Sequence, residues 1–465
     1  MGLTQGNPLS PTLFGLFSDG LDHYLGAHCP SSGVRLGQGK RVPDQDYADN
    51  VAFMTSDAAD MQLLLDAVRG FCQATGMAVS PEKTFIMVFG RESAALTPLC
   101  WQYGGQALVR VQQGKYLGLM LHEQWGVCMT FHHLRQKMWG AWATLKRQFA
   151  GLRCGGSVEL LLRVFRACVP PVAQYGCEVW GMMHMTAALQ RQRASLNASY
   201  IQMLRSIAGV RGTTPEPVVL LELGCTSLVN DWCLRVLRFW NALVAAPQGS
   251  IYKSIALQSC VDAVTRRDCK NWAYSVFRGL RDMGYEITIR CDVLAAVEIS
   301  SMRDMLRDMA ECRPFAGLDL NPRTCASRGA LLCTYHRWFA RSSGRVPRIL
   351  ALPVSHGQLI RFIRFRTSCH GLPVDVGRHH NIPRWERLCT ACGRGVGDEY
   401  HLVFECQALQ SVRGRYSHLF TPETGTLRAF IWQRQLLQVL RFVGECLDIV
   451  MDTSDGDAAG SPNQP

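Results

Sequence analysis

Four thiol and imidazole side chains near residue 400 have the spacing of a metal site. Cys389, Cys392, His401 and Cys406 follow one another with two, eight and four residues between them. Three thiolates and one imidazole are ligands that Zn²⁺ binds tetrahedrally, and a closed set of four protein ligands predicts a structural rather than a catalytic zinc. The alternative is an incidental grouping in a chain that holds 20 cysteines. Other possible ligands nearby are interpreted as surface or outer residues: Cys369, His370, His379 and His380.

Arginine is concentrated just before this cluster. Residues 323–394 hold 13 Arg and no Lys, and their acidic residues are Asp375 and Glu386. A guanidinium group binds phosphate bidentately, so the block predicts a polyanionic partner, RNA or DNA. The alternative is a general preference for Arg in a chain of net charge +12, with the side chains covering a helical surface.

Within the block, arginine alternates with aromatic residues in a way that is typical of contacts to phosphates and bases. Phe362 and Phe365 lie among the first arginines, and the last ones lead directly into Cys389. An amphipathic helix with a basic solvent face is the alternative interpretation. The candidate nucleic-acid contacts are Arg361, Arg364, Arg366, Arg384 and Arg387.

A second group of chemically suggestive residues lies in the first 122. Gly2 to Pro11 reads GLTQGNPLSP, which combines a Gln-Gly pair with two prolines that lead into a helix near Ser10. Residues 47–50 read Tyr-Ala-Asp-Asn and are followed by an apolar strand. Gly76 to Thr84 contains Lys83, and Tyr116-Leu117-Gly118 ends a run of apparent hairpin strands.

In this order, these segments resemble the palm of a reverse transcriptase from a non-LTR (LINE-type) retrotransposon, from motif B onward. Gly2–Pro11 is similar to that family's motif B, residues 47–50 to motif C, residues 76–84 to motif D and residues 116–118 to the primer grip. The cysteine cluster is similar to the zinc region that follows the polymerase in the same family. The resemblance implies catalytic positions at Asp49, Asn50 and Lys83. It also implies nucleotide or template contacts at Gln5, Gly6, Pro8, Tyr47, Tyr116 and Gly118.

The chemistry that the resemblance implies is an in-line phosphoryl displacement, in which carboxylates hold two Mg²⁺ ions. This sequence departs from the family pattern, because the second motif C acid is Asn50 and the motif A Asp lies upstream in the family. Asp44 and Asp46 are not expected to replace the missing ligand, since both precede Asp49 on its own strand. We therefore expect a polypeptide that does not polymerise alone. An upstream polymerase fragment is the partner that could supply the missing strand.

The elements that must position these residues follow from hydrophobic periodicity. A helix is expected between an N-cap at Ser56 and a C-cap at Gly76, a strand over Phe85–Phe89, and mainly helices from about 129 onward. The fold class is α+β: a truncated reverse-transcriptase palm, then a mostly helical thumb and connection, then a small zinc-knuckle domain. The expected boundaries are 1–122 partial palm, 123–210 thumb, 211–320 connection, 321–450 Arg-rich zinc region and 451–465 disordered tail.

Composition excludes several other classes. Hydrophobic residues make up 48% of the chain and charged residues 18%. These fractions are typical of a globular protein. No stretch of 18 apolar residues and no signal segment is found, so no membrane partner is expected, and the chain is expected to be intracellular, in nucleus or cytoplasm. No nucleophile elbow, phosphate loop or dinucleotide fingerprint is present.

Overall fold

The computed structural model divides the chain into two compact units, each assembled from three segments. The residues that it describes are 8–47, 50–90, 100–124, 126–151, 158–183, 187–265, 271–284, 296–299, 302, 335 and 348–458. Unit 1 comprises Met1–His133, Gly176–Gln192 and Arg235–Val297. Unit 2 comprises Leu134–Tyr175, Arg193–Leu234 and Glu298–Pro465. The contiguous domain boundaries expected from the sequence stay a prediction.

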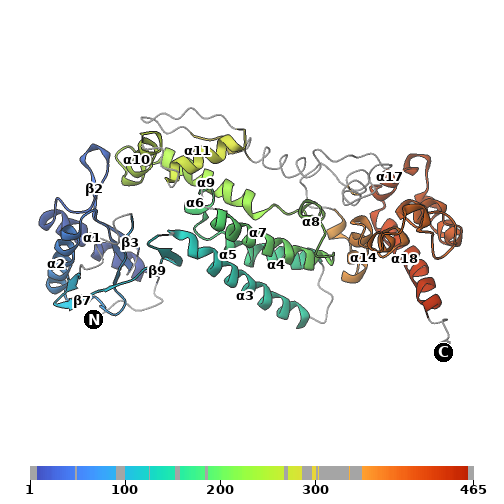
Figure 1. Ribbon diagram of the computed structural model, residues 1–465, viewed down its shortest axis with the longest axis horizontal. Helices are drawn as coiled ribbons and strands as arrows, with labels where there is room; N and C mark the ends of the chain where they lie inside the picture. Colours follow the sequence, from blue (N-terminus) through green and yellow to red (C-terminus); the bar gives the residue numbers. More distant parts are fainter. Residues whose placement is uncertain are drawn as a thin grey trace. The chain divides into compact units, whose positions relative to one another are not determined.

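Two long helices form the core of unit 1 (Figure 1). Leu21 and Leu25 of α1 (Ser10–His28) pack against Leu64, Val68 and Phe71 of α2 (Ala58–Thr75). The carboxylate of Asp57, rather than Ser56, caps α2 by accepting hydrogen bonds from the backbone of Ala59 and Asp60. Gly76 ends the helix at φ +70°, as the sequence predicts. This conformation is strained for residues with a Cβ.

The strands of unit 1 are short. In the described part of unit 1 each sheet has two strands. They pair as β1 (Val34–Arg35) with β2 (Arg41–Val42), β3 (Asp44–Tyr47) with β4 (Asn50–Phe53), β5 (Phe85–Ile86) with β8 (Val109–Arg110), β6 (Gln102–Tyr103) with β7 (Gln106–Ala107), and β9 (Gln113–Tyr116) with β10 (Leu119–His122). The strand expected over Phe85–Phe89 is therefore shorter, and it pairs in parallel with β8.

The later helices of unit 1 contain an aromatic cluster. These are α6 (Cys177–Trp180), the second half of α9 (Leu228–Ala245), α10 (Ile251–Thr265) and α11 (Trp272–Asp282). The rings of Trp240 and Trp272 lie 5.7 Å apart, and Trp240 also meets Phe277 edge-on. Such ring pairs add to the stability that their buried area supplies.

The first part of unit 2 is a helical layer (Figure 1). It contains most of α3 (Thr130–Gly151), with α4 (Val158–Cys168), α5 (Pro170–Ala173), α7 (Ala187–Ala208) and α8 (Glu216–Leu223). The ring of Phe165 packs edge-on against Trp142 and stacks with Tyr200, so α4 lies between α3 and α7. These contacts bury the apolar stripe that the sequence pattern predicts.

The C-terminal part of unit 2 packs around the rings of Phe420, Phe430 and Phe442, whose centroids lie 5.1–5.5 Å apart. Its α-helices are α14 (His356–Arg366), α15 (Pro373–His379), α16 (Gln410–Arg415), α17 (Leu427–Ile431) and α18 (Leu436–Ala458). Helix α18 runs to Ala458 and so enters the segment expected to be a disordered tail, of which residues 459–465 lie outside the described residues.

No single helix among the described residues has the length and hydropathy to cross a membrane. Among the described helices, α8 and α9 taken together meet such a criterion of length and composition, with a bend of 71° between them.

Candidate functional sites

The four predicted zinc ligands come together in unit 2. The ligand atoms of Cys389, Cys392, His401 and Cys406 all lie within 4.8 Å of one another. The sulfur atoms of Cys389 and Cys406 are 3.8 Å apart, and Cys392 Sγ lies 3.3 Å from His401 Nε2. A tetrahedral zinc with bonds of about 2.3 Å to sulfur and about 2.05 Å to nitrogen would place two sulfurs about 3.8 Å apart and sulfur and nitrogen about 3.6 Å apart. The donor set and its spacing therefore fit Zn²⁺.

A tight turn positions the first two ligands. The backbone N–H of Gly393 donates to Cys389 O at 2.8 Å, and Cys389 N–H donates to Gly395 O at 3.0 Å. Gly393 and Gly395 adopt φ +64° and +68°. These values favour glycine, because a Cβ is strained in the left-handed region. The turn therefore depends on glycine at both positions.

A single turn of π-helix, His401–Glu405, positions the other two ligands. The N–H of Cys406 donates to the carbonyl of His401 at 2.8 Å. This is the i to i+5 bond of a π-turn, and it brings side chains five residues apart to the same side. The Asp398 carboxylate accepts a hydrogen bond from His401 N–H at 2.9 Å and fixes the start of the turn.

The imidazole of His401 is oriented for ligation through Nε2. Its Nδ1 lies 3.3 Å from a carboxylate oxygen of Glu405, which can accept the Nδ1 proton. A carboxylate partner on the second ring nitrogen fixes the tautomer and the ring orientation of a metal-binding histidine.

The thiol groups of the cluster also repel one another when they are ionised. Burial, and then the neighbouring Cys389 thiol, raises the pKa of Cys406 to about 12. Burial alone would raise the pKa of Cys392, but hydrogen bonds to the surrounding groups instead lower it to about 7, and a bound cation would stabilise several thiolates together.

The nearby alternative ligands lie elsewhere, as the sequence interpretation expected. His370 Nε2 lies 3.0 Å from Glu399, and Leu372 N–H donates to its Nδ1. Burial alone would raise the pKa of Glu399, but hydrogen bonds from His370 and Ser368 lower it to about 2. Cys369 contacts Thr214, and His379 contacts Arg211. These residues therefore form contacts between the segments around the cluster and are not among the four candidate ligands.

The structure corrects one of the predicted nucleic-acid contacts. Arg366 is 1% exposed and its Nη2 lies 2.7 Å from the carboxylate of Glu222, which is also buried. Tyr335 donates its hydroxyl to the same carboxylate oxygen at 2.6 Å. Arg366 is therefore part of a buried ion pair and cannot reach a phosphate. Phe362 and Phe365 are buried as well, so the expected stacking at these rings is also wrong.

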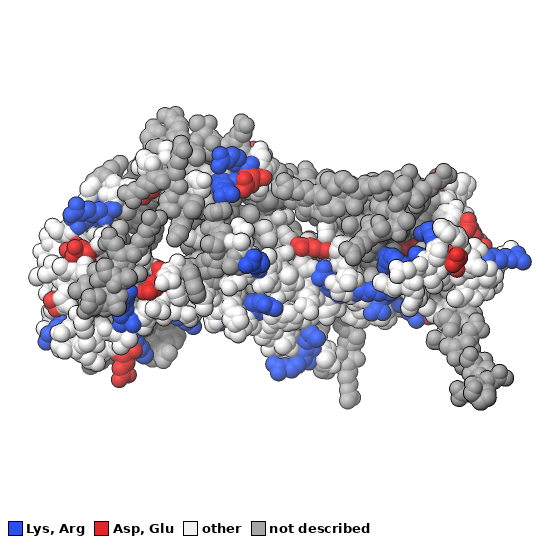
Figure 2. All heavy atoms as spheres, in the orientation of Figure 1, with Lys and Arg blue, Asp and Glu red and all other residues white. Residues whose placement is uncertain are grey.

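The other four arginines remain at or near the surface but are held in place. Arg361 pairs with Asp448, Arg364 donates to Gly209 O at 2.5 Å, and Arg384 lies 2.5 Å from the carboxylate of Asp398. Arg387 donates from Nε to Ile382 O and from Nη1 to Val374 O. On the face shown in Figure 2, basic side chains gather over the region that Figure 1 labels α14 and α18. Whether they bind nucleic acid stays a prediction.

The palm-like residues are only partly described. Gln5, Gly6 and Asp49 lie outside the described residues, and Tyr47 is described only as the last residue of β3, opposite Asn50. Asn50, Pro8 and Lys83 are exposed. Tyr116 donates its hydroxyl to Gln45 O at 3.4 Å, and Gly118 at φ +83° completes the turn from β9 to β10. The β9–β10 hairpin is thereby tied to β3, next to the Tyr47–Asn50 end of the β3–β4 hairpin.

Asp22 is an acidic residue of this region that the sequence does not predict. Carboxylate oxygens of Asp22, on α1, and of Asp44 and Asp46, on β3, lie within 4.8 Å of one another. Burial, and then repulsion from Asp22 and Asp46, raises the pKa of Asp44 to about 7. The pKa of Asp46 shifts in the same direction, with burial as the main cause and Asp22 next. The alternation of Asp44 and Asp46 signals a shared strand face, but no sequence pattern points to Asp22.

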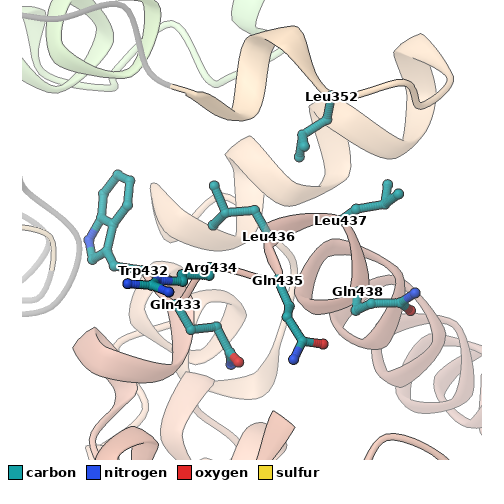
Figure 3. Close-up of a pocket in the computed structure, with 8 residues that line it drawn as sticks. All are labelled: Leu352, Trp432, Gln433, Arg434, Gln435, Leu436, Leu437 and Gln438. Carbon is teal, nitrogen blue, oxygen red and sulfur yellow. The ribbon is translucent and has the colours of Figure 1, made fainter. Parts of the chain in front are cut away.

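A cavity of about 560 Å³ is lined by the loop that joins α17 to α18, by the first residues of α18 and by Leu352 (Figure 3). Its lining combines apolar and amide side chains with one charged residue, Arg434. Trp432 stands at one side, with its ring 4.2 Å from the guanidinium carbon of Arg366. The described lining holds no acid, thiol or imidazole.

Comparison with known proteins points to RNA-directed DNA polymerases. Residues 1–121 match the family described as "Reverse transcriptase (RNA-dependent DNA polymerase)". A similar protein is the "Probable RNA-directed DNA polymerase from transposon BS" of Drosophila melanogaster, 26% identical over 238 residues. That alignment covers 46% of this chain and 23% of the relative, so the chain matches about a quarter of the relative's length.

Proposed function

We propose that this chain is part of a retrotransposon reverse transcriptase and that its own main activity is to bind nucleic acid through a zinc-stabilised region of unit 2. The observation that carries the proposal is the convergence of the three thiols and one imidazole at tetrahedral separations. The family match at residues 1–121 and the similarity to a transposon polymerase support nucleic acid as the partner.

Zinc would act here through structure. All four coordination positions of the zinc would be taken by Cys389, Cys392, His401 and Cys406. When bound, the metal would cross-link the Gly393–Gly395 turn to the π-turn. The protein supplies the rest. Glu405 orients the imidazole, and Asp398 caps the π-turn while pairing with Arg384. Because Arg384 and Arg387 lie on the segment that leads into Cys389, the same frame would hold the basic surface in shape.

The zinc assignment is tested by metal quantitation on the purified full-length chain. We expect about one Zn²⁺ per chain, and none in a protein with Cys389→Ser and Cys392→Ser, because two of four ligands are lost. Cys369→Ser is the matched control, since this thiol is nearby but contacts Thr214 instead. Unchanged zinc in the double variant, or loss of zinc in the control, would refute the assignment.

The proposal also holds that the 465-residue polypeptide does not polymerise nucleotides by itself. Two-metal displacement needs several carboxylates around the reacting phosphate. At the second motif C position the chain has the exposed amide of Asn50, which carries no negative charge to balance Mg²⁺. The second candidate function is the intact family's polymerisation with Mg²⁺, and the family match at residues 1–121 favours it.

Primer extension separates these two functions. With a primed RNA or DNA template and Mg²⁺ or Mn²⁺, we expect no template-dependent incorporation by the chain alone, while a reverse transcriptase of known activity extends the same primer. Incorporation by this chain that is lost in Asp49→Asn would overturn the proposal of inactivity. The expected upstream partner stays a prediction, which the same assay tests after addition of a separate upstream polymerase fragment.

A further inference from the structure

Exposed apolar side chains recur along residues 376–388, from α15 to the residue before Cys389 in unit 2, and are here called the apolar patch. Its members are Val376, 41% exposed, Ile382, 37%, Trp385, 73%, and Leu388, 48%. A side chain as large and apolar as tryptophan is usually covered, and an exposed apolar patch next to charged residues indicates a binding surface.

Trp385 is held on a braced turn. Pro383 precedes a 3₁₀ turn at Arg384–Glu386, and the N–H of Ile382 donates to Gly377 O at 2.9 Å. Arg387 crosses beneath this turn and donates to Ile382 O at 2.8 Å and Val374 O at 2.9 Å. The braced backbone presents the indole at little entropic cost to binding.

Gly377 is required for this brace. A Cβ at Gly377 would lie only 2.6 Å from Arg387 Cγ, so only glycine allows the arginine to approach α15 so closely. The backbone around Trp385 is therefore well packed, although the side chain of Trp385 itself is exposed.

Basic groups surround this turn. Arg384 and Arg387 lie in and next to the turn, and Arg378 lies in the last turn of α15. Asp375 is fully buried beneath Arg211 and Arg378, and Asp398 pairs with Arg384. Glu386, on the turn itself, is a further acid among the described residues and is exposed. The arginines therefore outnumber the acids around Trp385, and the charge of the surface is complementary to a polyanion.

We propose that Trp385 stacks on an unpaired base of single-stranded nucleic acid while Arg384 and Arg387 contact the adjoining phosphates. This inference rests on the proposed nucleic-acid binding and assigns it to one side chain. A flat aromatic ring on a protruding turn can lie against a base face only where the base is not already stacked within a duplex. The buried rings of Phe362 and Phe365 cannot do this, which moves the stacking surface from α14 to the turn before Cys389.

The test measures binding of the full-length chain by fluorescence anisotropy. The probes are a labelled oligothymidylate, the matching oligouridylate, an abasic oligonucleotide with the same number of phosphates, and a DNA duplex. We expect Trp385→Ala to weaken binding of the first two by about 5- to 150-fold, as for other stacking aromatics, and to leave abasic binding nearly unchanged. Trp385→Phe should retain most of the affinity.

The arginines are tested separately. Arg384→Ala should weaken binding to all probes and flatten the dependence of affinity on salt concentration, because a phosphate contact is lost. Tyr252→Ala, an exposed aromatic of unit 1, and Arg428→Ala, an exposed arginine of α17, are the matched controls and should leave binding unchanged. Zinc content and circular dichroism of each variant report whether the fold is intact.

The outcomes distinguish the inference from the function on which it rests. If the wild-type chain binds none of the probes, both fail. If it binds them, but the abasic probe binds as tightly as the others and Trp385→Ala changes nothing, the inference alone is overturned. The inference is also overturned if Trp385→Ala leaves nucleic-acid binding intact and abolishes self-association, because the patch is then a protein interface.

Discussion

The Glu222–Arg366 pair shows that the role of an arginine depends on the group it pairs with. The sequence predicts that Arg366 is exposed, like the other arginines of its block. Its Nη2 instead lies 2.7 Å from a carboxylate oxygen of Glu222, 144 residues away in the sequence. Breaking a buried ion pair leaves an uncompensated charge and is strongly destabilising, so this arginine serves the stability of unit 2. Its neighbours Arg361 and Arg364, on the exposed side of α14, keep the charged surface.

Replacement of one carboxylate should stabilise unit 1 at neutral and alkaline pH. Asp44 has a pKa of about 7 in the folded chain. Because an unfolded Asp titrates near pH 4, the folded state binds more protons than the unfolded state between about pH 4 and pH 7. The free energy of unfolding therefore falls as pH rises through this range. Asp44→Asn removes that loss, so we expect a higher Tm than wild type at pH 8 and little difference near pH 4.

Thermal unfolding followed by circular dichroism at several pH values measures this effect. Asp19→Asn is the control, because Asp19 is exposed on the same helix as Asp22 and lies outside the carboxylate cluster. A Tm of Asp44→Asn that falls below wild type at pH 8 would show that the carboxylate is favourable there, contrary to the repulsion among Asp22, Asp44 and Asp46.

At the scale of elements, the π-turn is the feature that makes the cysteine cluster possible. His401 and Cys406 are five residues apart, and an α-helix would place their side chains on different sides. The i to i+5 bond between them, with the Asp398 cap, directs both toward Cys389 and Cys392. The facing turn of Gly393 and Gly395 then completes the set.

Two glycines of that turn provide a matched pair of variants. Both have positive φ. The substitutions Gly393→Ala and Gly395→Ala should therefore each cost about 1–2 kcal/mol of stability. A Cβ at Gly393 meets nothing within 4 Å, whereas one at Gly395 would lie 3.1 Å from Nδ1 of His401. We therefore expect only Gly395→Ala to lose zinc faster as well, because the new methyl group displaces the imidazole.

Transfer of zinc to a colorimetric chelator measures the rate of loss, and denaturant unfolding measures the stability. Equal rates in the two variants would mean that the position of His401 tolerates the methyl group. A wild-type rate in both would mean that the turn does not control retention of the metal.

At the scale of the whole molecule, each unit has its own apolar core. In unit 1 the core lies between α1 and α2, and in the C-terminal part of unit 2 it lies around Phe420, Phe430 and Phe442. The cysteine cluster adds to the second of these, because Thr390, next to Cys389, donates its hydroxyl to Val450 O of α18 at 3.2 Å. Zinc binding should therefore stabilise part of one unit.

Removal of zinc should act locally. We expect a chelator to increase amide hydrogen exchange over residues 389–406 and the part of α18 near Val450, since the cross-link between their turns is lost. Exchange in α2 should not change, because its core contacts lie in unit 1. In the variant with Cys389→Ser and Cys392→Ser, exchange should already be fast without a chelator. Uniform acceleration across both units would contradict this division.

Much of the candidate metal site could be predicted because its residues are close in sequence. The four ligands span 389–406, and their order and spacing limit how far apart their side chains can lie. The helix ending at Gly76 is likewise confirmed, since a C-cap is a local backbone requirement. The N-cap at Ser56 is wrong, because Asp57 is the residue whose carboxylate meets the first amides.

By itself, the sequence determined which chemical groups this protein has and which of them are neighbours along the chain: the cysteine cluster, the arginine block and the palm-like motifs. Only the tertiary structure decided which side chains are covered and which distant groups meet. It buried Arg366 against Glu222, brought Asp22 to Asp44 and Asp46, and left Trp385 exposed. The physical reason is that burial and electrostatic pairing depend on partners from remote segments, which local spacing does not specify.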